Sequence, residues 1–457
     1  MATLPPLLSG AARQDISPAL GTQVDGDIGR YRPTEEIRNP IYVRALVLEQ
    51  GEEKFCVLSM DLLAVTTEWS DRVRKAIEDE CGIPFEAVAV HVTQTHSAPS
   101  LGKLMLSGRL PATEKYPWLR GMTHDYAEHA LTKIIAAVRE ARDSARPVLI
   151  SYAARPDGRV AFNRRYVMRD GSSTMFGRPN EEILHIEGPA DPEVGALSLK
   201  DENANSVALI LHHTSHPTHG YPHRYICPDW PGMWCDLVEP GLSGGMPLVV
   251  NGCCGNVHHN NALDPTQVDT ADRMAELLNE TTQTVISELK PSVSSRLQSM
   301  SSSIELPFRD ISTEKFENAH ALIDENPEPM WLDEEKTRVD WAWCYAASML
   351  DLEEMMSTQD SFEYEVQAVR IGDVAILVLT GEPFVEAQLE IKRRSPAART
   401  YVAHMSNGYS GYIPTPQAIK GGGYETDVCF SSKLAPEALG MIVEESVKVL
   451  AELMAYE

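Results

Sequence analysis

Strand-like and helix-like segments alternate along the whole sequence. Apolar runs of strand length at 41–49, 55–60 and 87–93 are separated or followed by amphipathic helical patterns at 67–81 and 122–143. This alternation is typical of α/β domains, in which helices cover the faces of a sheet. Neither a linker-like stretch rich in Pro, Gly and Ser nor a repeat with a period of about 20–50 residues divides the chain. We therefore expect a single large mixed-sheet α/β domain with flanking helices over residues 1–457.

The rest of the chain predicts further strands and helices of the same α/β domain and one peripheral segment. Further strands are predicted at 148–153, 183–187, 206–211, 247–251 and 296–309, and further helices at 270–288 and 434–455. Residues 362–380 predict a hairpin that turns at Gly372-Asp373. The acidic stretch 312–357 predicts two helices joined by ENPEPMW, and we interpret it as an insertion at the edge of the domain.

Charge and composition exclude several classes of protein. Forty basic against 66 acidic residues give a net charge of −26, which repels nucleic acid and anionic lipid. No apolar run approaches the roughly 20 residues that span a bilayer, and the N-terminus MATLPPLLSGAARQD does not resemble a secretory signal. The eight cysteines show no disulfide framework, so we expect free thiols. These counts thus predict a soluble, acidic, cytoplasmic protein, and they leave the oligomeric state open, a homo-oligomer included.

Histidines are concentrated in one part of the sequence. Seven of the 14 lie between residues 212 and 259, namely His212, His213, His216, His219, His223, His258 and His259. The first five follow the predicted strand 206–211. If that strand stays extended to Pro217, His212 and His216 share one face and His213 points the other way. Any one of these histidines is well explained by ordinary hydrogen bonding, but the cluster as a whole favours a metal or catalytic site.

A second strand end, AVAVHVTQTHSAPSLG at 87–102, carries Gln94 and His96 on one face and His91 on the other. The zinc motif HExxH, a CxxC pair and a G-x-S-x-G nucleophile turn are all absent. Cys253-Cys254 are adjacent, a poor geometry for joint ligation, and we expect them to be buried core thiols.

Two later segments also place polar side chains after apolar runs. Glu382 follows AILVLTG, a position where α/β enzymes carry site residues. It could equally be an acid at the N-terminus of the helix that follows. The Gly-rich segment Asn407–Tyr412 brings two tyrosines, which could be site residues or core aromatics.

Taken together, these segments resemble the neutral/alkaline ceramidase family, its bacterial ceramidase-like branch more closely than the ceramidases themselves. No single motif is decisive, but eight occur in the family's order over almost the whole chain. They are SGAARQDISPALG (9–21), THSAP (95–99), Asn163-Arg164-Arg165, SHPTH (215–219), CPDWPGMW (227–234), NGCCGNVHHNN (251–261), TGEPF (380–384) and NGYSGYIPTPQAIKGGGYE (407–425).

The resemblance implies the fold of the ceramidase N-terminal catalytic domain and a zinc amidohydrolase site with one zinc per chain. The family's metal is held by two histidines, a glutamate and a tyrosine, of which three fall on His216, Glu382 and Tyr412. The remaining site positions fall on His96 as a catalytic, non-ligand histidine, on Arg164 as the arginine that orients the substrate, and on Tyr424 as a tyrosine that assists the chemistry.

Gln94 stands where the family has its first ligand histidine, and glutamine is a weaker zinc ligand than imidazole. Three outcomes follow: His96 replaces the missing ligand, Gln94 binds through its carbonyl oxygen, or the metal is lost or changed. We favour His96 or Gln94 completing a working site. The chain also lacks the serine of the family's block near His258 and ends where ceramidases continue into a β-domain, so an enzyme of extracellular lipid surfaces is not expected.

The function expected is a zinc-dependent hydrolase of a soluble small molecule, acting on an amide C–N bond through water activated by zinc. Ester, glycosidic or eliminative chemistry on a sugar is an alternative, since the polar loops 217–234, 255–264 and 407–425 suit a polyhydroxylated substrate. The other alternative is a non-catalytic binding protein whose metal site has decayed at Gln94.

Overall fold

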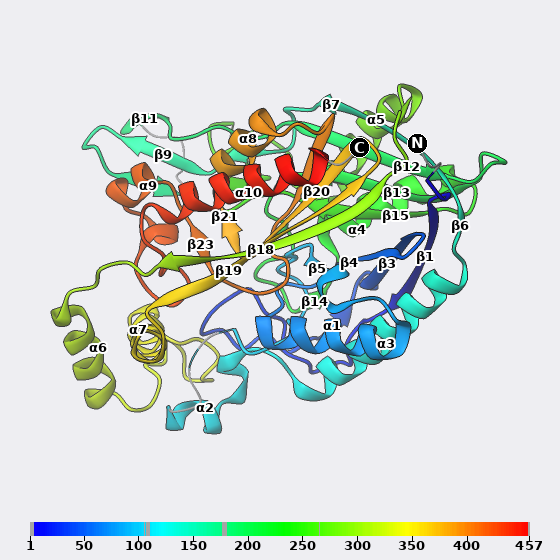
Figure 1. Cartoon of the computed structure of the whole chain (residues 1–457). Coiled ribbons are helices and arrows are strands. Elements are labelled where there is room, and N and C mark those ends of the chain that lie inside the picture. Colours follow the sequence, from blue (N-terminus) through cyan, green and yellow to red (C-terminus); the bar gives the residue numbers. More distant parts are fainter. Residues whose placement is uncertain (1–3, 105, 107–109, 176–180, 265, 456–457) are drawn as a thin grey trace.

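Three β-sheets share one apolar core, and each carries helices on its outer face (Figure 1). The computed structural model describes residues 4–104, 106, 110–175, 181–264 and 266–455. Within them, side chains from all three sheets join in one buried cluster, for example Val47, Ile210 and Ile376. This is the mixed-sheet α/β architecture that the alternation of patterns predicts.

The first sheet contains the N-terminal strand and lies beneath two helices. In order across the sheet its strands are β5 (Val88–Val92), β4 (Glu53–Met60), β3 (Tyr42–Gln50), β1 (Leu8–Asp15) and β6 (Arg146–Pro147). Helices α1 (Thr67–Cys81) and α3 (His124–Asp143) cover its outer face (Figure 1). Because β4 and β5 run parallel, the chain crosses over through α1 between them and leaves β5 at its carboxyl end.

The second sheet is built around β13 (Ser206–His213), a strand in which every residue is buried. Its order is β15 (Met246–Asn251), β13, β12 (Glu193–Lys200), β7 (Leu149–Pro156) and β17 (Lys290–Pro291). In β13, Ala208 and Ile210 face the shared core, whereas Leu209 and Leu211 face α4 (Asp229–Val238) and α5 (Ala271–Ser287). Both faces are buried, which is why this strand reads as a continuous apolar run.

The third sheet repeats this arrangement. Its strands are β18 (Leu297–Pro307), β19 (Ser361–Ile371), β20 (Val374–Leu379) and β22 (Arg399–Ala403). Along β20, Ile376 faces the shared core and Leu377 faces α10 (Ala438–Ala455), which lies over the sheet with α8 (Val385–Arg394) (Figure 1). Burying each such aliphatic side chain contributes about 1.5–3 kcal/mol, so the alternation on both faces holds the helices to the sheet.

Short strand pairs and helices connect these layers. The remaining strands are β2 (Glu36–Ile37) with β14 (Tyr225–Ile226), β8 (Phe162–Asn163) with β16 (Val257–His258), β21 (Glu382–Pro383) with β23 (Tyr412–Ile413), and β9 (Arg165–Met168) between β10 (Ser173–Met175) and β11 (Ile183–Ile186). The remaining helices are α2 (Pro111–Lys115), α6 (Thr313–Glu325), α7 (Trp341–Thr358) and α9 (Pro416–Gly421), with one-turn 3₁₀ helices at 85–87, 117–120, 239–242 and 424–426.

The predicted elements match the structure closely, with two differences. The helix expected at 67–81 is α1, and the hairpin expected around Gly372-Asp373 is β19–β20. Strand β13, however, ends at His213 and does not extend to Pro217, because the chain turns away and His216 N donates to Val257 O (3.2 Å). The connection between α6 and α7 is also longer than ENPEPMW: it runs to Asp340, whose side chain caps α7. That 312–357 is an insertion stays a prediction.

The state of the cysteines is as the sequence predicts. All eight cysteines are buried and free, so the free-thiol prediction is confirmed, and Cys253 and Cys254 are core thiols as expected. Within the described residues, no helix combines the length and the apolar character that crossing a bilayer requires.

Candidate metal centre and active site

A cavity of about 1240 Å³ lies where strand ends from the three sheets meet. Among the residues that line it are all seven site residues predicted from sequence: Gln94, His96, Arg164, His216, Glu382, Tyr412 and Tyr424. The segments that carry Gln94, His216 and Glu382 follow β5, β13 and β20, and each of these strands pairs in parallel with a neighbour. Carboxyl ends of parallel strands are where α/β folds place ligand sites.

His96 and His216 face each other across this cavity. Their Nε2 atoms are 3.1 Å apart. The Nδ1 atom of His96 lies 2.9 Å from Gly26 O, and that of His216 lies 3.2 Å from Cys254 O. A carbonyl oxygen only accepts hydrogen bonds, so each Nδ1 carries the proton and, in the neutral ring, each Nε2 presents a lone pair. Burial lowers the pKa of both rings, that of His96 to about 4. Two lone pairs that point at each other repel, and a cation bound between them would remove this repulsion.

Glu382 brings a carboxylate to the same place. Its side chain is buried, and its Oε2 atom lies 4.0 Å from His216 Nε2 without a hydrogen-bond partner. Oε1 accepts a hydrogen bond from Tyr409 Oη (3.3 Å). Burial raises the pKa of Glu382 to about 7, against the opposing influence of Gln94, Arg164 and the neighbouring tyrosines. A buried carboxylate oxygen without a partner is costly, and a bound cation would relieve that cost.

Tyr412 is the residue opposite Glu382 in the β21–β23 pair. Its hydroxyl oxygen accepts a hydrogen bond from Nη2 of Arg164 (3.4 Å). Arg164 is itself fixed by Gly255 O (2.6 Å) and by Glu425 Oε1 (3.0 Å). Burial raises the pKa of Tyr412 well above its usual value, while the Arg164 charge opposes this effect. The guanidinium therefore supports negative charge on the Tyr412 oxygen.

Tyr424 differs from the other site residues in its exposure. It is 40% exposed, whereas Tyr412 is 6% exposed. The two rings are in edge contact, with centroids 5.7 Å apart, and the ring of Trp341 also contacts Tyr424, with centroids 5.8 Å apart. Two aromatic contacts fix the ring while the residue keeps access to the cavity. This placement suits a residue that touches substrate better than one that binds a metal.

Gln94 lies in the site, but its amide oxygen is already engaged. Cys254 Sγ donates to Gln94 Oε1 at 3.4 Å, and Gln94 also lies close enough to Glu382 to lower the pKa of that carboxyl. The backbone of Gln94 is in the left-handed region at φ 71°, held by a hydrogen bond from its N–H to Leu62 O (3.0 Å). Such a conformation costs about 1–2 kcal/mol outside glycine. Gln94 therefore bridges Cys254 and Glu382, and His96 is the side chain that faces His216.

The donor set fits a zinc ion. His96 and His216 offer imidazole nitrogens, Glu382 a carboxylate oxygen and Tyr412 a phenol oxygen. Zinc in proteins takes nitrogen and oxygen donors of these kinds, commonly four in number. The two facing lone pairs and the unpartnered Oε2 of Glu382 are the features of this chain that such an ion would satisfy.

Three histidines near these strands have structural roles. His91 Nδ1 lies 2.7 Å from His404 O. His212 stacks on Tyr401 with ring centroids 5.0 Å apart, and His213 Nδ1 donates to Glu193 O (3.0 Å). All three are fully buried and none of them lines the cavity. The face shared by His212 and His216, which an extended strand would have produced, is therefore not formed.

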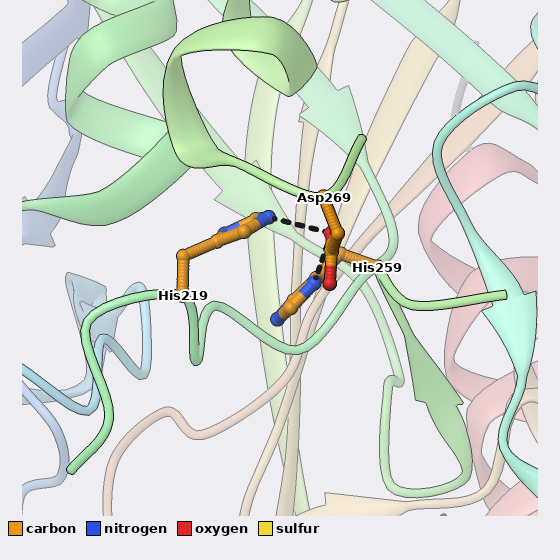
Figure 2. A group of neighbouring side chains, drawn as sticks. All are labelled: His219, His259 and Asp269. Carbon is orange, nitrogen blue, oxygen red and sulfur yellow. Dashed lines mark hydrogen bonds and ion pairs between the residues drawn. The ribbon is translucent and has the colours of Figure 1, made fainter. Parts of the chain in front are cut away.

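A second group of polar side chains is formed by His219, His259 and Asp269 (Figure 2), of which His259 and Asp269 line the same cavity. Both histidines belong to the cluster singled out from sequence, but Asp269 does not stand out there. It precedes Thr270, which caps helix α5, and an acid at that position is ordinary in any helical protein. Tyr409, which donates to Glu382, was noted only as one of two tyrosines of uncertain role.

Comparison with known proteins adds to this geometry. No family model matches the sequence, and no curated protein matches it. Among solved structures, the chain is similar to the neutral ceramidase from Pseudomonas aeruginosa, with a TM-score of 0.73 and 16% identity over 98% of this chain and 75% of that one. It is also similar to a ceramidase complexed with C2, with a TM-score of 0.71 and 17% identity over the same shares of the two chains.

These similarities extend over almost the whole chain, but at such low identity they bear on the fold alone, and activity has to be argued from the site. The resemblance seen in the eight sequence motifs and the similarity of the structures agree with each other. The chain therefore has the mixed α/β fold of the neutral ceramidases.

Proposed function

We propose that this protein is a zinc-dependent hydrolase that cleaves an amide bond in a soluble small molecule. The observation that carries the proposal is the pair of Nε2 atoms of His96 and His216, 3.1 Å apart, with both Nδ1 atoms committed to backbone carbonyls. The unpartnered oxygen of Glu382 lies 4.0 Å from one of them. This arrangement is unfavourable without a cation and favourable with one.

Four residues would hold the zinc: His96, His216, Glu382 and Tyr412. His96 takes the place that Gln94 leaves, because the amide oxygen of Gln94 accepts from Cys254. When bound, zinc supplies a Lewis acid that polarises a carbonyl group and makes water a better nucleophile at neutral pH. With His96 as a ligand, proton transfer falls to other groups at the cavity.

Arg164 and Tyr424 would act on the substrate side. Arg164 is buried and its charge lies beside the Tyr412 oxygen, where it stabilises negative charge in a water-poor site. Tyr424 is partly exposed at the cavity and contacts two rings, so its hydroxyl could donate to an oxygen that gains charge in the transition state. Fixed donors of this kind are commonly worth a factor of about 10²–10³ in rate.

An amide substrate also agrees with what the structural neighbours are. Both are ceramidases, and the fold is shared over 98% of this chain. The rest of the cavity wall is mixed. Its polar part includes Asn260, Asn261 and Gln267, and its apolar part includes Leu104 and Trp118. We infer a substrate with a polar portion and a modest apolar portion on either side of the bond that is cleaved.

A sugar-like substrate is the second candidate, and the run of amides and acids at 260–269 favours it. This run offers Asn260, Asn261, Asp264, Gln267 and Asp269 to the cavity, and such side chains bind hydroxyl groups well. In that case the same metal would serve ester or glycosidic cleavage, or elimination. The bond cleaved separates the two candidates.

The test is a substrate screen with the zinc-loaded protein across N-acyl amides, esters and glycosides. We expect turnover of an amide that a chelator abolishes and added zinc restores. His216→Ala should abolish it, whereas His320→Ala should not, because His320 is exposed and pairs with Glu353. Cleavage confined to esters or glycosides would refute the amide assignment. A protein that binds no zinc and turns over none of these compounds would be a binding protein with a decayed metal site.

A further inference from the structure

The group formed by His219, His259 and Asp269, here the His–His–Asp cluster, shares no residue with the proposed zinc ligands His96, His216, Glu382 and Tyr412. In Figure 2 the two rings lie against each other and both reach the carboxylate of Asp269. Asp269 Oδ1 is 2.7 Å from His259 Nδ1 and 3.3 Å from His219 Nε2. One possible ligand atom from each of the three side chains lies within 4.8 Å of the others.

His219 is oriented from behind by a second carboxylate. Its Nδ1 donates to Asp229 Oδ1 at 2.7 Å, and Asp229 is fixed by the backbone N–H of Trp230 (2.7 Å) and of Gly220 (3.3 Å). Proteins commonly hold a metal-binding histidine in this way, with a carboxylate on the nitrogen that does not bind the metal. The other nitrogen, Nε2, is buried, points at Asp269 and has no hydrogen bond of acceptable geometry.

His259 has a comparable support on its far side. Its Nε2 atom lies 2.9 Å from the hydroxyl oxygen of Thr218. A hydroxyl can donate or accept, so Thr218 can support either tautomer of the ring. His259 Nδ1 can therefore present a lone pair toward Asp269 without losing its other hydrogen bond. Asn260 Nδ2 holds the second oxygen of Asp269 at 3.2 Å, which leaves Oδ1 facing the two rings.

We propose that the His–His–Asp cluster is a second metal site, which binds a divalent first-row transition metal such as zinc through His219 Nε2, His259 Nδ1 and Asp269 Oδ1. Two imidazoles and one carboxylate are the donors that these metals take. Two carboxylates, those of Asp229 and Asp269, flank the ring of His219, with side chains 1% and 21% exposed. A divalent cation held by His219 and Asp269 would be attracted by both.

The cluster faces the same cavity as the first site. His259 and Asp269 both line it. A ring contact connects the two sites: His258 lies between His216, at a centroid distance of 6.5 Å, and His259, at 3.9 Å. With three protein ligands, a metal here keeps coordination positions for other groups. We infer that it would bind a hydroxyl or anionic oxygen on the part of the substrate remote from the bond cleaved.

The experiment measures zinc per chain after the protein is loaded with Zn²⁺ and excess metal is removed by dialysis, with folding checked by circular dichroism. We expect about two zinc ions per wild-type chain and about one in His219→Ala and in Asp269→Asn. His216→Ala, which removes a ligand of the first site, should also retain about one. The matched control His320→Ala, a histidine paired with a carboxylate away from the cavity, should retain about two.

The outcomes separate the two sites. If wild type binds one zinc per chain, and Asp269→Asn retains it while His216→Ala loses it, the second site is refuted and the proposed function stands. If wild type binds one zinc per chain, and Asp269→Asn loses it while His216→Ala retains it, the cluster is supported and the first site is refuted. If Asp269→Asn does not fold, His259→Gln serves in its place, and its retention of both ions would overturn the proposal.

Discussion

Glu425→Gln is the substitution with the clearest structural consequence at this site. Glu425 is fully buried and joins two buried arginines: Oε1 accepts from Nε of Arg164 at 3.0 Å, and Oε2 accepts from Nη1 of Arg165 at 2.8 Å. Arg164 in turn donates to Tyr412. Glutamine keeps the shape of the side chain, removes its charge and turns one acceptor into a donor that faces a guanidinium.

The size of the effect follows from the burial of the three groups, whose side chains are at most 4% exposed. Breaking a buried ion pair by removing one partner costs about 3–5 kcal/mol, since the other charge is left uncompensated. Arg165 keeps Glu187 at 2.9 Å, which limits the loss on that side. We therefore expect Glu425→Gln to lower the free energy of unfolding by about 3–5 kcal/mol, a large part of the roughly 5–15 kcal/mol of a typical domain.

Urea unfolding of the metal-free protein measures this loss, and Glu187→Gln is the matched control. Glu187 is 14% exposed and pairs with Arg165, which retains Glu425, so its substitution should cost only about 1 kcal/mol. Glu425→Gln should also weaken zinc binding about tenfold, because Arg164 no longer holds Tyr412. Equal losses of stability in the two variants, or a loss below about 1 kcal/mol in both, would refute the argument that Glu425 anchors this side of the site.

Three further predictions concern single residues. Gln94→Ala should bind zinc nearly as well as wild type. His96→Ala should lose more zinc affinity than the roughly 10–100-fold that is lost when a residue supporting a metal ligand is removed. Zinc titrations that show the reverse would make Gln94 the ligand. Tyr424→Phe should keep its zinc and lose about 10²-fold in rate, because only a hydroxyl donor is removed; normal turnover in a zinc-loaded sample would assign that tyrosine another role. Burial lowers the pKa of Lys433 to about 7, so above that pH the unfolded chain binds the extra proton. Between about pH 7 and 8.5, the free energy of unfolding of wild type should therefore rise by about 2 kcal/mol relative to that of Lys433→Met. Urea unfolding that shows a constant difference between the two proteins over this range would contradict the prediction.

The sequence predicted many of the longer elements of the fold, but it missed β12, β22 and α4 and did not predict how the elements assemble. Helix α1 was predicted with both ends, since its amphipathic pattern stops at Gly82, which takes the left-handed conformation at φ 67°. Strand β1 (Leu8–Asp15) was not predicted, because LSGAARQD carries small and polar residues. It becomes a strand by pairing along its whole length with β3, and strand formation depends more on such partners than on local preference.

The sequence identified the segments that line the candidate site, but it did not determine which side chains face one another there. Position in the resembling motif made His96 a catalytic, non-ligand histidine and Gln94 the counterpart of a ligand. In the structure the ring of His96 faces His216, and the amide oxygen of Gln94 is engaged with Cys254. Both side chains line the cavity, and His96 is the one that faces His216 after a left-handed turn at Gln94. No spacing rule predicts a left-handed glutamine, because that conformation is unfavourable without tertiary support.

Glu382 and Asp269 show how the surroundings of an acid separate a functional role from that of a helix N-terminal acid, which sequence alone left equal for Glu382 and did not raise for Asp269. Both acids stand just before a helix, Glu382 before α8 and Asp269 before α5, where the helix dipole by itself accounts for a carboxylate. An acid with that role alone would lie in solvent. Glu382 is instead 4% exposed with an unpartnered oxygen near His216, and Asp269 turns one oxygen toward two histidine rings. Burial of a charge requires a specific partner, and in both places the partner that we propose is a bound cation.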